Sequence, residues 1–92
     1  MDHTSFGDMC LGQAGRDFQG VVRAIAVDDA LCAMPPAEME RRLIELGFVE
    51  GAHVRLLHEG PFGRDPIAVR VNGATVALRR REAMAIHVIE TR

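Results

Sequence analysis

The sequence contains no lysine, tryptophan or tyrosine, and its 11 basic residues are all arginines. Without lysine, the chain has no lysine side chain to form a Schiff base with a substrate, nor can it build the lysine-containing phosphate loop of a nucleotide hydrolase. Without tryptophan and tyrosine, it lacks the aromatic groove with which SH3 modules bind proline-rich peptides. Four phenylalanines also provide few rings for stacking on the bases of single-stranded nucleic acid.

Charge and hydrophobicity exclude further classes of protein. Thirteen acidic residues outnumber the 11 basic ones, for a net charge of −2, which argues against a general nucleic-acid-binding protein. No apolar run approaches the length of about 18 residues that a membrane-spanning helix requires. The first residues, Met1 to Thr4, lack the basic and apolar parts of a signal peptide, so we expect a cytoplasmic protein.

The chain of 92 residues, 48% of them hydrophobic and 26% charged, has the size and composition of one small folded domain. Cys10 and Cys32 have no metal-binding or redox spacing, and in the cytoplasm we expect both to be reduced. Residues 1–18 are polar, contain three glycines and show no periodicity. We therefore expect an irregular N-terminal extension over residues 1–18 and a single domain over residues 19–92.

One strand and one helix are predicted in the first half of that domain. Residues 21–27 form a β-branched run that is typical of a strand. Two prolines then open a segment in which Met39, Leu43 and Leu46 share one helical face. Gly47 can adopt the left-handed conformation that ends a helix, and Phe48 can fold back over Leu43 as the hydrophobic contact of a Schellman cap.

The second half predicts several short strands. Apolar and polar residues alternate over residues 53–58 and again over residues 67–71. Asn72 and Gly73 then predict a two-residue type I′ hairpin turn. A return strand carries Val76 and Leu78 inward, residues 79–84 form a short helical turn, and residues 86–89 form the closing strand. We therefore predict a mainly β fold, a small barrel with one inserted helix and a helical turn before its last strand.

Three sequence blocks resemble a known family. Residues 42–51 read Arg-Leu-Ile-Glu-Leu-Gly-Phe-Val-Glu-Gly, residues 60–66 read Gly-Pro-Phe-Gly-Arg-Asp-Pro, and residues 77–88 read Ala-Leu-Arg-Arg-Arg-Glu-Ala-Met-Ala-Ile-His-Val. In this order they are similar to the conserved blocks of the FeoA family, ferrous iron transport protein A, and the resemblance covers residues 19–91. The chain departs from that pattern at Arg64, an extra residue inside the Gly-Asp-Pro turn.

The resemblance implies an SH3-like barrel and a cytoplasmic accessory protein of ferrous iron uptake. Its implied partner is FeoB, the membrane GTPase permease, through which the protein would be peripheral to the inner membrane. An alternative relationship is to the SH3-like C-terminal domain of DtxR-type metal-dependent repressors, which would make the chain a regulatory domain. Such a domain normally follows a helix-turn-helix and a dimerisation domain, and this sequence has neither, so we favour the transport accessory.

Candidate partner-binding residues come from the three blocks. Phe62, lifted by Pro61, is an apolar anchor on a rigid loop, and the alternative is that the loop is only a connecting turn. Arg79, Arg80 and Arg81 form a basic cluster that is either solvated or pairs with an acidic surface of the permease. Around the end of the predicted helix, Leu46, Gly47 and Phe48 complete the set.

Catalysis and a built metal site are not predicted. No nucleophile has a neighbouring base at informative spacing, so we expect no enzymatic activity and no required cofactor. His3, His53, His58 and His87 lack the spacing of a metal site and read as scattered surface imidazoles. The alternative is that an exposed histidine near Glu50 or Glu59 shares a divalent ion with a second molecule, which would give a metal-bridged homodimer.

Overall fold

The computed structural model describes residues 8–27 and 34–91 and contains six strands and three short helical elements in that part of the chain. His3 and Cys32 lie outside the described residues. The elements in chain order are strand β1 (Asp8–Cys10), 3-10 helix η2 (Leu11–Gln13), strand β2 (Gln19–Ile25), helix α1 (Pro36–Glu45), strands β3 (His53–Glu59), β4 (Ile67–Val71) and β5 (Ala74–Leu78), helix α2 (Arg80–Ala83) and strand β6 (Ile86–Glu90).

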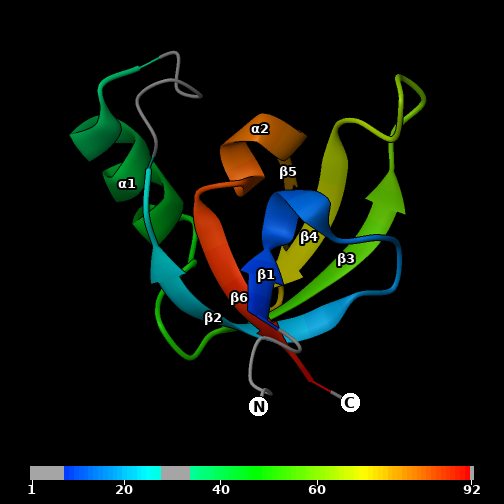
Figure 1. Ribbon diagram of the computed structural model, residues 1–92, viewed down its shortest axis with the longest axis horizontal. Coiled ribbons are helices and arrows are strands. Elements are labelled where there is room, and N and C mark those ends of the chain that lie inside the picture. The colour runs from blue at the N-terminus through cyan, green and yellow to red at the C-terminus, as the bar shows by residue number, and fades with distance from the viewer. Residues whose placement is uncertain (1–7, 28–33, 92) are drawn as a thin grey trace.

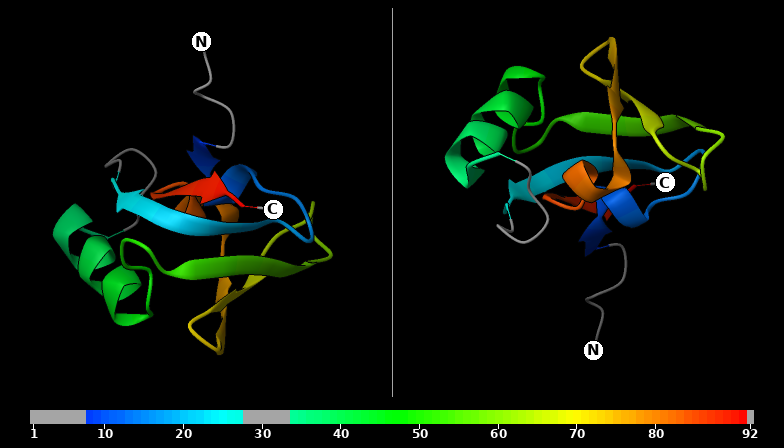
Figure 2. Two further views of the ribbon diagram at one scale, coloured as in Figure 1. Left: turned by 90° about the horizontal axis from the view of Figure 1, so that it is seen from below. Right: turned by 90° about the horizontal axis from the view of Figure 1, so that it is seen from above.

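The six strands form one antiparallel sheet in the order β1-β6-β2-β3-β4-β5. The sheet is strongly twisted, with β6 and β2 lying opposite β3 and the β4–β5 hairpin, while α1 lies to one side (Figures 1 and 2). The predicted mainly β architecture with one inserted helix is confirmed. Among the described strands, however, β1 and β5 are the two ends of the sheet and do not pair with each other, so the sheet is not closed into a barrel by hydrogen bonds.

Two helical turns, η2 and α2, connect the two ends of the sheet, where β1 and β5 do not pair with each other. Helix η2 follows β1, and α2 follows β5, and the two turns contact each other. They lie so close that a Cβ added to Gly12 would come within 2.4 Å of the Arg80 carbonyl oxygen. Side-chain packing and hydrogen bonds between η2 and α2 therefore connect the two ends of the sheet in place of a β ladder.

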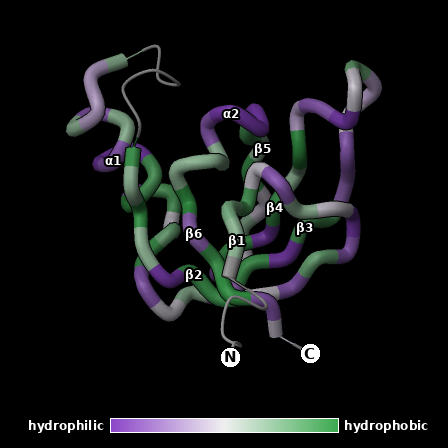
Figure 3. Tube along the Cα trace, in the orientation of Figure 1, coloured by the Kyte–Doolittle hydropathy of each residue, from purple (hydrophilic) through white to green (hydrophobic). Residues whose placement is uncertain are grey.

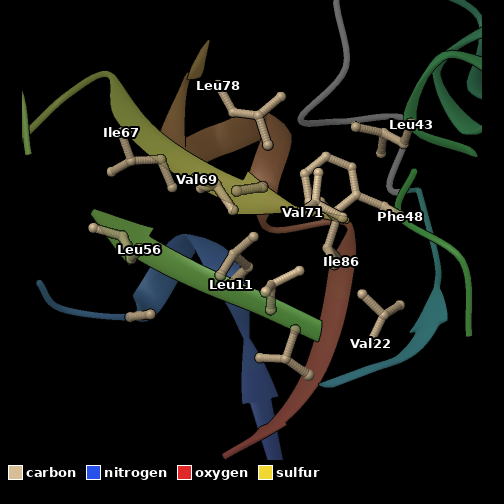
Figure 4. Close-up of a cluster of buried hydrophobic side chains, with 14 of the residues drawn as sticks. Leu11, Val22, Leu43, Phe48, Leu56, Ile67, Val69, Val71, Leu78 and Ile86 are labelled. Carbon is tan, nitrogen blue, oxygen red and sulfur yellow. The ribbon is translucent and has the colours of Figure 1, made fainter. Parts of the chain in front are cut away.

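The core consists almost entirely of aliphatic side chains, as the shortage of aromatic residues requires. Alternation along β3 and β4 points Val54, Leu56 and Val69 inward, and each of them is at most 3% exposed. The same alternation appears as changing hydropathy along these strands (Figure 3). Phe48 is the largest fully buried side chain and lies among aliphatic residues of several strands and α1 (Figure 4).

Helix α1 ends in the Schellman cap that the sequence predicts. The Gly47 N–H donates to the Ile44 carbonyl at 2.9 Å, and the Phe48 N–H donates to the Leu43 carbonyl at 3.0 Å. Gly47 has a φ of 111°, a value that L-residues with a side chain rarely adopt. The cap therefore directs Phe48 into the core beside Leu43.

The β4–β5 hairpin also has the predicted geometry. Asn72 and Gly73 have φ values of 49° and 81°, and positive φ at both central residues defines a type I′ turn. The Asn72 side-chain amide donates to the Gly47 carbonyl at 3.4 Å, so the hairpin touches the C-terminal cap of α1.

The N-terminal segment differs from the prediction of an irregular extension over residues 1–18. Within it, β1 pairs with β6, and Leu11 of η2 is fully buried in the core. A three-residue strand is too short to show periodicity, and β1 forms only because β6, nearly 80 residues later, supplies its partner (Asp8 opposite Ile89). The ordered domain therefore begins before residue 19. No helix in the described ranges has the length and apolar character needed to cross a membrane.

The geometry of the α1 cap gives a first testable prediction. Replacing Gly47 with alanine forces a side chain into a φ of 111° and places its Cβ 3.3 Å from the Asn72 amide nitrogen. We expect Gly47→Ala to lower the free energy of unfolding by about 1 to 3 kcal/mol, measured by urea denaturation. Gly15→Ala is the matched control, because nothing lies within 4 Å of its added Cβ, and equal effects of the two changes would contradict the role of the cap.

Candidate partner-binding groove

The connection between β3 and β4, residues 60–66, presents Phe62 to solvent. Phe62 is 81% exposed, which is the highest value among the large hydrophobic residues in the described part of the chain. The loop beneath it is tied by its own backbone, because the Gly60 N–H donates to the Pro66 carbonyl at 2.8 Å and the Phe62 N–H donates to the Asp65 carbonyl at 3.3 Å. Phe62 therefore stands at the tip of a braced turn and is not part of the core.

A groove of about 650 Å³ lies beside Phe62, and we call it the Phe62 groove. Three parts of the chain form it: α1, the residue 60–66 loop, and the segment from β5 into α2. Its lining residues are Arg42, Phe62, Asp65, Pro66, Ala77, Leu78, Arg79 and Glu82.

The acidic residues of the groove accept hydrogen bonds from the backbone of α2 and its cap, whereas the basic residues are exposed to solvent. The Asp65 carboxylate accepts the Arg80 backbone N–H at 2.9 Å, and the Glu82 carboxylate accepts the Arg79 backbone N–H, also at 2.9 Å. These bonds cap the start of α2, so both carboxylates are held by the fold. Arg79 is exposed, and Arg42 forms only a loose 3.8 Å ion pair with Glu82. The groove therefore offers an apolar surface with a basic rim.

Arg80 does not belong to this rim, because its guanidinium group is used inside the fold. Its Nη1 donates to the carbonyl oxygens of Gly12 at 3.1 Å and Ala14 at 2.7 Å. Its Nε donates to the Arg64 carbonyl at 2.8 Å, and its Nη2 forms a 2.8 Å ion pair with Glu59. We call this set of contacts the Arg80 clamp. It joins η2, the residue 60–66 loop and the end of β3 to α2.

The clamp divides the predicted basic cluster. Arg79 and Arg81 are exposed, whereas Arg80 is partly buried with a side chain that is 21% exposed. The sequence of three consecutive arginines does not show which one turns inward, because that depends on carbonyl groups of distant segments that accept its hydrogen bonds. Arg80 is therefore a structural residue, and the residues of the cluster that remain open to a partner are Arg79 and Arg81.

The structure also separates the three candidates at the end of α1. Phe48, one of the predicted partner-binding residues, is fully buried, so its ring packs in the core and is not presented at the surface. Leu46 packs partly against the core and Gly47 is half-buried in the cap. Pro61 is exposed beside Phe62. Arg42, Ala77 and Leu78 line the groove as well, which sequence analysis missed because their separation in the chain hides their proximity.

The described residues contain no group of three or more His, Cys, Asp or Glu side chains that could hold a metal ion. Glu59, one of the acids that could have assisted a histidine, is engaged by Arg80. His53 and His58 are exposed on β3, as alternation predicts for His53. His87 lies across from Cys10, with Nδ1 4.0 Å from the sulfur.

The Arg80 clamp gives a second prediction. Shortening Arg80 to glutamine leaves the Glu59 carboxylate and three backbone carbonyl groups without their donor. We expect Arg80→Gln to lower the free energy of unfolding by about 2 to 3 kcal/mol, measured by urea denaturation. Arg81→Gln, which removes an exposed neighbour of the same type, should change it by less than about 0.5 kcal/mol. Equal losses in the two variants would show that the clamp contributes nothing specific.

Comparison with solved structures places this arrangement among known proteins. FeoA of Stenotrophomonas maltophilia, a prokaryotic SH3 domain protein in complex with zinc, is 34% identical, with a TM-score of 0.71 over 87% of this chain and 88% of that one. FeoA of Chlorobium tepidum is 32% identical, with a TM-score of 0.72 over 91% of this chain and 71% of that one. A manganese-dependent transcriptional repressor is 26% identical, with a TM-score of 0.73 over 91% of this chain and 42% of that one.

No match is found among curated proteins. The model of the FeoA domain, however, matches residues 9–90, which span every element from β1 to β6. The match begins at β1, in agreement with the ordered N-terminal segment of the structure. With its SH3-like antiparallel sheet, the chain belongs to the FeoA domain family, whose members take part in ferrous iron transport.

Proposed function

We propose that this protein is a non-catalytic cytoplasmic accessory of ferrous iron uptake that binds a FeoB-type membrane GTPase permease through the Phe62 groove. The observation that supports the proposal is an 81% exposed phenylalanine on a braced loop beside an apolar groove. Complete burial of such a ring would stabilise the protein or a complex by about 2 kcal/mol, and this stabilisation is absent while the ring is in water. A partner that covers the ring would recover this free energy.

The shape and charge of the groove describe the surface that it fits. Phe62, Pro66 and Ala77 supply an exposed apolar face above the buried Leu78, and an apolar surface of the partner would exclude water from it. Arg42 and Arg79 on the rim would pair with acidic residues at the edge of that surface, where guanidinium forks match carboxylates. The contact would therefore be anchored by apolar burial and oriented by charge, with salt weakening chiefly its rate of formation.

The proposal includes no chemical step. The carboxylates that line the groove are held by the N-terminus of α2, and the guanidinium group of Arg80 makes its hydrogen bonds within the fold. What the groove residues can do is bind, and by binding change the behaviour of the permease or of its GTPase domain.

The anchor role of Phe62 can be tested directly. We expect Phe62→Ala to weaken binding to the cytoplasmic part of the permease by at least about tenfold, measured by isothermal titration calorimetry, since anchor residues at interfaces contribute more than about 1.4 kcal/mol. The melting temperature should stay within about 1 °C of the wild type, because the ring lies outside the core.

Val49→Ala is the control for this experiment, because Val49 is also an exposed apolar residue, 43% exposed, but does not line the groove. It should leave affinity unchanged. A large drop in melting temperature for Phe62→Ala would show that the ring serves the fold, and unchanged affinity would remove the groove from the proposed interface.

A second candidate function is favoured by the similarity to the manganese-dependent repressor, of which this chain matches 42%. In that case the chain would act as an SH3-like regulatory domain in metal-dependent transcription. The two candidates differ in cells that lack the protein. Loss of ferrous iron uptake with unchanged transcription of metal-responsive genes supports the transport accessory, whereas altered transcription with intact uptake supports the regulatory domain.

A divalent ion that an exposed histidine near Glu50 or Glu59 shares with a second molecule stays a separate proposal. The zinc in the Stenotrophomonas maltophilia structure belongs to that protein. In this chain the structure adds a different pair of neighbouring donors, Cys10 and His87, whose Sγ and Nδ1 atoms are 4.0 Å apart on adjacent strands. Two donors make half of a tetrahedral zinc site, so a second molecule would have to provide the remainder.

A further inference from the structure

A row of polar side chains crosses the outer face of the sheet, away from the Phe62 groove. The register of β2, β3, β4 and β5 places one residue of each strand in this row. All four are exposed, because the residues on either side of them in β3 and β4 point into the core. The row consists of Gln19, Arg55, Arg70 and Thr75.

The centre of this row brings two positive charges together. Arg55 and Arg70 are direct partners across the β3–β4 ladder, and like charges at such positions repel and destabilise the sheet. Arg55 has one acidic neighbour, Asp17, but the contact is a 3.8 Å pair between side chains that are 51% and 74% exposed, which offers little stabilisation. In the described part of the chain, Arg70 has no ion pair.

The two arginines line a pocket of about 330 Å³ at one end of β2, β3 and β4. Apart from Val54, the side chains that line it can donate hydrogen bonds, and no carboxylate is among the lining residues. Gly20 and Gly73 also line the pocket and contribute backbone without side-chain bulk. Besides the two arginines, the polar lining side chains are Gln19, His53, Asn72 and Thr91.

We propose that this pocket binds a phosphate group. Two guanidinium groups that repel each other across a β ladder are stabilised by an anion between them, and planar forks match phosphate oxygens well. A phosphate group carries up to two negative charges and several acceptor oxygens, which suits two arginines surrounded by neutral donors. A single carboxylate would neutralise only one guanidinium group and leave most of these donors without an acceptor.

The pocket is independent of the groove and of the proposed function. Its lining residues and those of the Phe62 groove do not overlap. The residue 60–66 loop and α2 lie at one end of the molecule in Figure 1. The turn after β4 and the residue that follows β6, which contribute to the pocket, lie at the other end, where the chain terminates. A bound phosphate group would leave the groove accessible to a partner.

The test titrates the full chain with inorganic phosphate and follows backbone and arginine side-chain signals by NMR, with sodium chloride at equal ionic strength as the reference. We expect saturable shifts centred on Arg55, Arg70 and His53 that chloride does not cause. Arg70→Gln should weaken phosphate binding by roughly tenfold, the effect of losing one charge-assisted contact, without lowering the melting temperature, because the repulsion is removed as well.

Two further variants make the test specific. Asp17→Asn removes the carboxylate that competes for Arg55, so it should strengthen phosphate binding; Asn tolerates the positive φ of 72° at this position. Arg81→Gln, an exposed arginine away from the pocket, should leave binding unchanged. Identical shifts with chloride and phosphate, or an equal loss of binding in Arg81→Gln and Arg70→Gln, would overturn the proposal by showing only general charge screening.

A second experiment, with lipid vesicles, distinguishes a lipid headgroup from a free phosphate ion as the source of the phosphate group. Vesicles of phosphatidylglycerol that bind the wild type but not Arg70→Gln would support the pocket with a lipid headgroup as the source. Binding of inorganic phosphate without binding of vesicles would support it with a free phosphate ion. A hexaglutamate peptide that shifts the same signals when neither phosphate source does so would overturn the proposal in favour of an acidic peptide.

Discussion

The guanidinium group of Arg80 is the contact on which the arrangement of this small domain depends. Its bonds to the carbonyl groups of Gly12 and Ala14 hold the first helical turn, and its bonds to Arg64 and Glu59 hold the loop between β3 and β4. Arg80 follows β5, at one end of the sheet order, whereas its acceptors Gly12 and Ala14 follow β1, at the other end, 68 and 66 residues away in sequence. One partly buried cation with four acceptors thus connects the two ends of the sheet without a β ladder, and these acceptors offset part of the cost of removing its charge from water.

The clamp has a consequence for the surface, because it fixes the loop that carries Phe62. An exposed apolar side chain on a mobile loop would lose conformational entropy when a partner ordered it, whereas one on a braced turn has already been ordered by folding. Asp65 adds to the bracing by capping α2. The interaction that holds the fold together is therefore also the one that prepares the proposed interface, while the arginine pair on β3 and β4 is set by strand register alone.

Particular residues show how far the sequence could be interpreted before the structure. The helix with its Gly47 cap and the Asn72 and Gly73 turn were predicted in detail, because each depends on the backbone preferences of a few consecutive residues. Phe48 was assigned two incompatible roles, cap contact and partner contact, and only the packed core decided between them. Residues 8–13 were taken as irregular because β1 and η2 are stabilised by distant partners and have no local pattern of their own.

The sequence by itself determined the elements from β2 onward, the hydrophobic faces of the strands and the resemblance to the family, since all three are carried by local spacing and by blocks of consecutive residues. The tertiary structure alone decided which arginine of three turns inward, which phenylalanine is buried and which is exposed, and which side chains meet in the Phe62 groove. Those outcomes depend on contacts between segments up to about 70 residues apart, such as Arg80 with Gly12. No short stretch of sequence contains the information that such a contact requires, because the donor and its acceptors become neighbours only when the sheet has formed.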